Sequence, residues 1–380
     1  MTDVSARRPP VSPPAKLVVL SESDLPNLAQ FIASQSGREA GAVENHLRWF
    51  LLENPARHPQ IPLGCGLASP EGQLVGCILY VPQIFRWQAK TLLVLGSSSF
   101  YVDEPYRGTG GLIFLRFSEL AAKWPLFGNS ANADAARLWK ARGAVPIPYS
   151  DHELFGVLRW RGVIEEALHR HRVSQPLSRV AAGAGAVLAR SFKRLKFSSA
   201  RSGNFNPGEV KEDLTQLTSA DQVMQLPCIA SPECHGLPND RVTAQRDLPY
   251  IRWRYFSGRD STVAVFAFRN SEAPSGVLVT VNQRPRGYRS QISTLNLLDI
   301  YPPASPSLSV SIIAALAARY RGAVDAIVLR SFDPELQEAF LHLGFLRRKL
   351  EAPNGWFLDK AGHLPTRDWY TVPADGDWLI

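Results

Sequence analysis

The sequence is poor in cysteine and methionine, with four and two of them among 380 residues. The cysteines form no CxxC pair, which argues against a zinc ribbon and against a disulfide framework. Two of them, Cys65 and Cys77, lie inside β-like apolar runs, so we interpret the four cysteines as reduced and mostly packing residues. Cys228, Cys234 and His235 lie close together, but no fourth ligand is evident, so we predict no bound metal.

Long apolar segments are also missing. No run of about 18 apolar residues is present, which is the length that spans a membrane. The opening segment, MTDVSARRPPVSPPAK, is rich in proline and has no apolar stretch, so it predicts a disordered tail over residues 1–16 and not a signal peptide. We therefore expect a cytoplasmic protein.

Basic residues are in excess. The chain has 42 Lys and Arg against 34 Asp and Glu, a formal charge of +8 and a pI of about 9.4. This balance favours an anionic partner such as a nucleotide phosphate, a nucleic acid or an anionic membrane face, without choosing among them. Because 380 residues exceed what one ordinary hydrophobic core holds, we expect two domains.

The first part of the chain alternates strand-like and helix-like segments in the order β-αα-βββ-α-β-α-β. Short apolar runs bounded by turns predict the strands, and polar caps followed by helical spacing predict the helices. Strands then resume through Leu158. The predicted strands are Leu17–Leu20, Leu63–Ala68, Leu74–Val81, Thr91–Val102 and Leu126–Asn129, and the predicted helices are Ser21–Phe31, Ala42–Leu52, Gly110–Lys123 and Ala133–Ala141.

The second part repeats features of the first. HLRWF around Trp49 is matched by YIRWRYF around Trp253. NADAARLWKARGA is matched by DPELQEAFLHLGF, each with a polar cap, a helix and a terminating glycine at the same interval. We infer two similar domains, over 17–164 and 206–380. Between the second set of marks we predict strands at Val263–Phe268, Gly276–Val281 and Ile292–Ile300 and a helix at Ser309–Arg319.

The connecting segment, residues 165–205, is rich in Ala, Gly, Ser and basic residues. We predict a partly helical linker with a solvated face. Its portion 177–197 has the character of a basic amphipathic helix, so a second interpretation is peripheral contact with a membrane surface or another anionic partner.

The stretch VDEPYRGTGGLIF joins a predicted strand to a predicted helix. Three glycines within four residues weaken regular structure, so the bare backbone is either a close-packing turn or an anion site. The first N–H groups of a helix lack intrahelical partners and favour negative charge, and Arg107 adds a charged donor. The stretch is not a P-loop, because no lysine followed by Ser or Thr is present, and it lacks GxGxxG spacing.

RGTGG after a long strand, with NADAARLWKARGA further along the chain, resembles the GNAT family of acyl-CoA-dependent N-acyltransferases. Arg107 and Gly110 match the Arg/Gln-x-x-Gly-x-Gly/Ala signature, while Leu112 departs from it. The resemblance covers about residues 17–160. It implies an α/β (α+β) fold with two tandem domains, each a mixed, mostly antiparallel central sheet flanked by helices.

In that family the backbone of this turn holds the CoA pyrophosphate, and the preceding strand pairs with the pantetheine amides. The family's second motif is Asn-x-x-Ala-x-x-Leu-Tyr-x-x-x-Gly-Phe, and here Asn132 and Gly143 fit it, with Trp139 in place of the Tyr. The resemblance therefore implies acetyl-CoA or another acyl-CoA as co-substrate. The residues expected to bind it are Tyr101, Val102, Arg107, Gly108, Thr109, Gly110, Gly111, Leu112, Asn132 and Trp139.

Two departures bear on catalysis. Trp139 stands where the family's tyrosine often protonates the leaving thiolate, and an indole N–H is no useful acid. The strand segment GSSSFYV lacks the carboxylate that some members use as base. Ser98 and its neighbours are candidates to orient a water, or they satisfy a splayed strand edge.

The matching joint in the second part, LLDIYPPASPSLSVSII, has no glycine turn and no arginine, and its prolines remove backbone donors. We predict that the second domain does not bind CoA. Asp299 ends its long strand and is either a base or amine anchor or a hydrogen-bonded structural aspartate. His235 is another candidate base.

These features predict an acyl-CoA-dependent N-acyltransferase acting on a small-molecule amine or amino sugar, as in cell-envelope or polysaccharide synthesis. One alternative is a Fem-like transferase that uses aminoacyl-tRNA, the one case in which we expect nucleic acid as a partner. Another is a module that binds CoA, or nothing, without catalysis.

Overall fold

The computed structural model describes residues 14–88, 90–170, 213–230, 241–257, 262–286, 292–330, 333–367 and 369–370. The described residues up to 170 form what we call the first half, and those from 213 onward form the second half.

Several predictions fall on residues outside these ranges. They include nearly all of the tail predicted over 1–16, most of the linker at 165–205, the candidate membrane segment at 177–197, and Cys234 and His235. Among the described helices, none is both long and apolar enough to cross a bilayer.

The first sheet is built around a long antiparallel ribbon of β3 and β4. Its strand order in the described chain is β1-β2-β3-β4-β5-β15-β6, and β9 and β16 extend it beside β3. The strands are β1 (Lys16–Leu20), β2 (Gly64–Ala68), β3 (Leu74–Trp87), β4 (Lys90–Val102), β5 (Leu126–Gly128), β6 (Val145–Pro146), β9 (Val242–Ala244), β15 (Trp356–Leu358) and β16 (Trp369–Tyr370).

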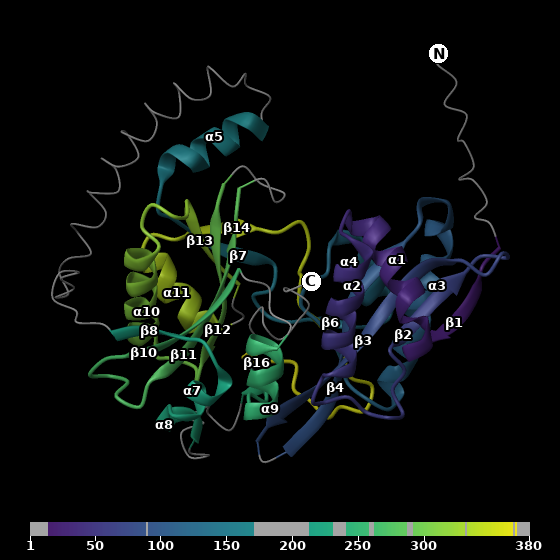
Figure 1. The fold of residues 1–380 in the computed structure, drawn as a ribbon, viewed down its shortest axis with the longest axis horizontal. Coiled ribbons are helices and arrows are strands. Elements are labelled where there is room, and N and C mark those ends of the chain that lie inside the picture. Colours follow the sequence, from purple (N-terminus) through teal and green to yellow (C-terminus); the bar gives the residue numbers. More distant parts are fainter. Residues whose placement is uncertain are drawn as a thin grey trace.

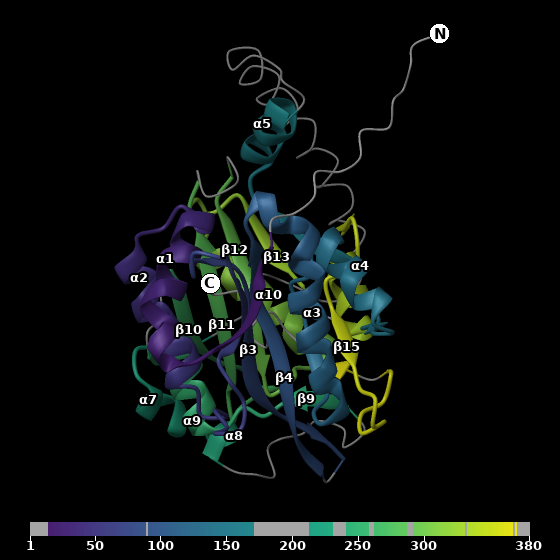
Figure 2. The same ribbon diagram turned by 90° about the vertical axis from the view of Figure 1, so that its right-hand side faces the viewer.

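Helices cover both faces of this sheet (Figure 2). Successive side chains of a strand point to opposite faces. Cys77 and Leu79 of β3 accordingly pack with α1 and α2, while Ile78 and Tyr80 pack with α3 and α4. The helices are α1 (Leu25–Ser36), α2 (Ala40–Leu47), α3 (Gly110–Glu119) and α4 (Ala133–Ala141).

The second sheet has the strand order β14-β7-β13-β12-β11-β10-β8. Helices α10 (Pro306–Arg319) and α11 (Pro334–His342) bury apolar residues against one face of it. Its other described helices are the short α7 (Ala220–Met224), α8 (Pro227–Ala230) and α9 (Leu248–Ile251). Its strands are β7 (His152–Val157), β8 (Asp213–Leu217), β10 (Val263–Arg269), β11 (Val277–Arg284), β12 (Thr294–Tyr301), β13 (Ala326–Leu329) and β14 (Leu346–Lys349).

Both sheets are mixed and mostly antiparallel. In each, one central pair is parallel, β4–β5 in the first and β12–β13 in the second. Figure 1 shows the two sheets side by side, each with its own helices. This arrangement confirms the predicted fold class.

The two halves exchange a strand. β7 of the first half lies between β13 and β14 of the second sheet, and β15 of the second half lies between β5 and β6 of the first. The crossing segments also bond to each other: Leu350 N–H donates to the Asp151 carbonyl at 2.8 Å and Asn354 N–H to the Ser150 carbonyl at 2.9 Å. The boundaries predicted at 164 and 206 stay a prediction, but neither sheet is complete without a strand from the other half.

A pair of tryptophans joins the halves symmetrically. Each lies in a short π-helical turn, Arg48–Leu52 after α2 and Arg252–Phe256 after α9. The Trp49 indole donates to the Trp253 carbonyl at 2.8 Å, and the Trp253 indole donates to the Trp49 carbonyl at 2.9 Å. The helix predicted over Ala42–Leu52 is therefore an α-helix only to Leu47, and the π-turn places its tryptophan in the interface.

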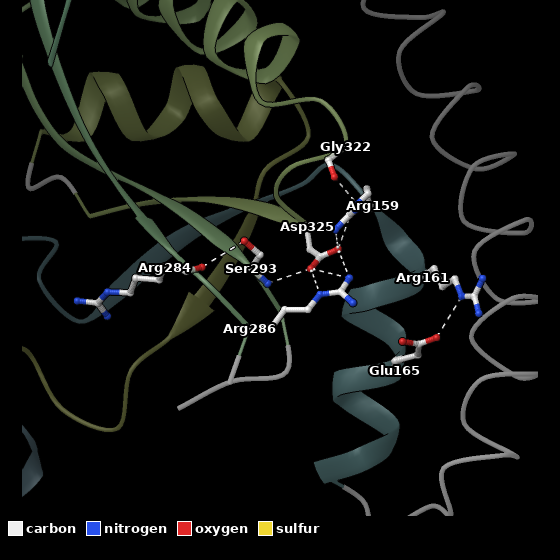
Figure 3. Close-up of polar contacts among 8 residues, drawn as sticks. All are labelled: Arg159, Arg161, Glu165, Arg284, Arg286, Ser293, Gly322 and Asp325. Carbon is white, nitrogen blue, oxygen red and sulfur yellow. Dashed lines mark hydrogen bonds and ion pairs between the residues drawn. The ribbon is translucent and has the colours of Figure 1, made fainter. Parts of the chain in front are cut away.

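The helix that leaves the second sheet, α5 (Trp160–Arg170), is anchored at its start by Asp325 (Figure 3). This buried carboxylate accepts from Arg159 Nε at 2.8 Å and from the Ser293 N–H at 2.9 Å, and it also contacts Arg286. A Cβ on Gly162 would come within 2.6 Å of Asp325 Oδ1, so the approach requires glycine. Beyond this anchor, α5 projects away from both sheets (Figure 1).

Candidate functional site

The parallel strands of the first sheet separate early. β4 pairs with β5 at Leu95 and Gly96, and then runs on to Val102 while staying paired with β3 on its other side. Beyond Gly96, β4 and β5 have no further paired residues in the part of the chain that the structure describes. Backbone groups on this edge of β4 therefore face the gap between the strands, where a ligand with amide groups can pair with them.

A bulge distorts β4 inside this gap. The pairing with β3 shifts register between Cys77 and Leu79, opposite Ser99. Ser99 has φ of 49°, a left-handed value that is uncommon for a residue with a side chain. Its carbonyl accepts from the Cys77 thiol at 3.3 Å. A bulge of this kind bends the strand and changes the direction of neighbouring side chains.

A cavity of about 610 Å³ opens where the strands separate. Residues 97–101 of β4, residues 130–133 before and at the start of α4, and Trp139 contribute to the wall from the first half. The opposite wall comes from the second half and includes the segment that carries the chain from β14 to β15. Its members are Arg284, Arg330, Leu350, Glu351, Ala352 and Asn354.

Four of the predicted site residues line this cavity: Ser98, Tyr101, Asn132 and Trp139. The Ser98 hydroxyl lies 3.3 Å from that of Ser99. Asn132 caps α4 by accepting from the Ala135 N–H at 2.9 Å. The Trp139 indole packs edge-on against Phe114 and Phe117 of α3, so one side chain belongs to both the core and the cavity wall.

The other predicted donor-binding residues lie at the joint beyond β4. The chain forms a 3-10 turn over Glu104–Thr109 before α3 begins at Gly110. The Gly110 N–H bonds to the Arg107 carbonyl inside this turn. A Cβ on Gly111 would meet nothing within 4 Å, so that position is open to solvent or ligand. Val102, Arg107, Gly108, Thr109, Gly110, Gly111 and Leu112 are not among the cavity-lining residues.

Asp299 does not reach the cavity. Its side chain is completely buried and accepts from Arg246 Nε at 2.6 Å and from the Tyr255 hydroxyl. The Arg246 side chain is equally buried. This placement agrees with the second interpretation of the sequence, a hydrogen-bonded structural aspartate, because a base has to lie within hydrogen-bond reach of the substrate.

The sequence reasoning missed the wall from the second half. Arg284 ends β11, Arg330 follows β13, and Glu351 and Asn354 lie between β14 and β15. Glu351 is exposed. It is the one residue with a carboxylate side chain among the described residues that line the cavity. No local motif marks these positions, because only the packing of the two halves makes them face β4.

The sequence itself matches no family model and no curated protein. The structure, however, resembles several solved ones. A GCN5-related N-acetyltransferase from Anabaena variabilis is 12% identical with a TM-score of 0.52, and a probable N-acyltransferase from Enterococcus faecalis is 9% identical with 0.51; in each case the match covers 90% of this chain and 72% of the other.

An N-myristoyltransferase from Saccharomyces cerevisiae, solved with bound myristoyl-CoA, is 11% identical with a TM-score of 0.50. That match covers 93% of this chain and 81% of the yeast chain. Together with the two mixed sheets and the separation of β4 from β5, these likenesses establish the architecture. The chain has the GNAT fold in a tandem arrangement.

Proposed function

We propose that the chain is an acyl-CoA-dependent N-acyltransferase, with acetyl-CoA as the simplest donor. The observation that carries the proposal is the open edge of β4 beyond Gly96, which borders a cavity of about 610 Å³. An edge of this kind pairs with the amides of a pantetheine arm as it would with a strand. The similar solved structures are N-acetyl-, N-acyl- and N-myristoyltransferases, which supports the same proposal.

The donor enters from the joint between β4 and α3. Its pyrophosphate lies at the start of α3, where helix N–H groups and the Arg107 guanidinium favour negative charge. Pantetheine runs along β4 past Val102 and Tyr101. The thioester then reaches the cavity near Ser98 and Trp139.

In the reaction, a neutral amine attacks the thioester carbonyl carbon, a C–N bond forms, and the C–S bond breaks. Backbone N–H groups at the β4 edge polarise the carbonyl oxygen. Ser98, with Ser99 beside it, orients a water that takes the ammonium proton, and Glu351, the carboxylate among the described lining residues, receives that proton. The departing CoA thiolate takes its proton from solvent, because Trp139 supplies no acid.

The acceptor is a small-molecule amine or an amino sugar, held by the wall from the second half. Cell-envelope or polysaccharide synthesis is the setting we propose. A non-catalytic CoA-binding module is kept as a second candidate, because the described first-half lining residues include no carboxylate.

Calorimetry with acetyl-CoA and myristoyl-CoA tests donor binding, and Gly111→Asp is the informative variant. A Cβ at this position would meet nothing within 4 Å, and an aspartate in the first turn of a helix favours the helix while repelling a pyrophosphate. We expect an affinity loss of about tenfold or more, equivalent to about 1.4 kcal/mol. Gly111→Asn, similar in shape but uncharged, is the matched control and should bind nearly as wild type.

Other outcomes separate the candidates. Absence of acyl-CoA binding by the wild type would overturn the proposal. Binding without release of free CoA thiol over a panel of amines would favour the non-catalytic module. Retention on tRNA with a steep salt dependence would favour the Fem-like alternative.

A further inference from the structure

Among the residues that the structure describes, the charged ones that line the cavity come from the second half. They are Arg284, Arg330 and Glu351, whereas the described lining residues of the first half carry no charge. The wall that faces the β4 edge therefore presents two guanidinium groups and one carboxylate.

Arg330 is held in place by the exchanged strand. Its Nε and Nη2 both lie 2.7 Å from Oε2 of Glu153, a buried residue of β7. Arg348 of β14 contacts the other oxygen of the same carboxylate. The Arg330 side chain is 21% exposed and lines the cavity, so it is a fixed donor group at an accessible surface.

Two other arginines, Arg284 and Arg348, lie close enough to Arg330 to affect its charge. Burial lowers the pKa of Arg330, and the nearby Arg348 and Arg284 act in the same direction, while Glu153 opposes them. Guanidinium groups that lie close to one another repel. An anionic group bound at this wall would offset that repulsion.

We propose that Arg284 and Arg330 bind an acidic group, a carboxylate or a phosphate, that the acceptor carries besides its amine. A guanidinium matches either oxyanion with paired N–H donors. Glu351 on the same wall suits the ammonium group of the acceptor. The cavity is therefore complementary to an acceptor that carries one positive and one negative group. The acceptor role rests on the proposed N-acyltransferase function.

The position of the arginines assigns them to the acceptor and not to the donor. The proposed pyrophosphate site is at residues 107–112, none of which lines the cavity. The thioester end runs along the β4 edge on the first-half wall. Arg284 and Arg330 stand on the opposite wall, from which the amine has to approach.

Acceptor binding without any donor tests this inference separately from the proposed function. Two matched pairs are titrated at millimolar concentration by calorimetry: glucosamine 6-phosphate against glucosamine, and phenylalanine against its amide. We expect the acidic member of at least one pair to bind about tenfold tighter or more, as a charged hydrogen-bonded pair implies. The pair that responds identifies phosphate or carboxylate.

Arg284→Met should abolish this preference. Arg286→Met is the matched control: it removes the same charge two residues away, and Figure 3 shows its side chain turned toward Asp325 while Arg284 extends elsewhere. The control should keep the preference. A cooperative melting transition above the assay temperature in each variant establishes that both are folded.

The inference is overturned if neither acid binds, if neutral and acidic members bind alike, or if both arginine variants lose the preference equally. Loss of acyl-CoA binding with the acid preference intact would instead overturn the proposed function alone. Normal acyl-CoA binding without a preference for the acidic ligand would overturn this inference and leave the proposed function in place.

Discussion

In each sheet, the central pair of parallel strands separates at an equivalent position. The residues beyond the last paired residues differ between the two sheets. In the first sheet, the last rung of the parallel pair joins Gly96 to Phe127; in the second, it joins Leu297 to Leu329. The next residue is Gly128 in one sheet and Arg330 in the other, and both line the same cavity. The two separations therefore face one cavity, with a bare backbone on one side and a guanidinium on the other.

The two sheets also differ further along the strands that have separated. Beyond its last rung, the second sheet holds the buried group of Asp299, Arg246 and Tyr255, and the Tyr370 hydroxyl bonds to the Ile300 carbonyl at 2.8 Å. The first sheet has serines and an open strand edge there. A repeated fold thus carries different functions in its two copies, because side chains decide whether a strand separation is open or filled.

Removal of Arg246 should destabilise the buried group that fills the gap between β12 and β13 in the second sheet. Arg246→Met leaves the Asp299 charge buried without its cation, so the free energy of unfolding should fall by about 3–5 kcal/mol. Urea denaturation measures it. The double variant Arg246→Met/Asp299→Leu should recover most of the loss, and Arg116→Met, which removes an exposed ion pair with Glu119, should change little. A loss for Arg246→Met below about 1 kcal/mol would contradict the structural role.

Substitutions in the tryptophan pair test whether the two halves contribute equally to the free energy of unfolding at their interface. Trp49→Phe and Trp253→Phe each remove an indole donor and leave a buried carbonyl, so each should cost about 1–3 kcal/mol. The two losses should agree within about 0.5 kcal/mol. Denaturant midpoints with a double-mutant cycle measure both, and a loss confined to one variant would show that the interface is symmetric in geometry alone.

Gly128→Ala tests the open side of the cavity. The added Cβ would lie 3.0 Å from a Trp139 ring carbon and 3.2 Å from Ser97 Oγ. We expect acyl-CoA affinity to fall several-fold, about 1 kcal/mol, because the wall has to give way. Calorimetry with acetyl-CoA measures the change, and unaltered affinity would place the thioester away from Gly128.

The smallest effect concerns thiol chemistry at the β3–β4 ribbon. Burial raises the pKa of Cys77 to about 12 and also raises that of Cys65, so both stay protonated and shielded at about pH 8.5. In a Cys228→Ser/Cys234→Ser variant, native protein should resist alkylation at this pH and react fully in urea. Mass spectrometry gives the count, and rapid native labelling would contradict tight packing at the bulge.

Much of the local structure was predictable because it depends on near neighbours. The cap at Asn132, the end of the helix before Gly143 and the matching features at Asp333 and Gly344 result from capping and from a glycine with positive φ. The π-turns were not predictable, since packing of Trp49 against Trp253 decides them. The sequence placed Ser98 in the strand that proves to border the cavity, and its role stays a prediction, while Asp299 needed the structure to reveal its buried partners.

Residue types within a few positions were enough to set the order of elements, the glycine joint at residues 107–112 and the loss of that joint in the repeat. The exchange of β7 and β15, and the cavity wall that carries Arg284, Arg330 and Glu351, came only from the folded chain. The physical reason is distance along the chain. Residues more than a hundred positions apart meet through backbone pairing between strands, and no local pattern encodes which edge a strand will join.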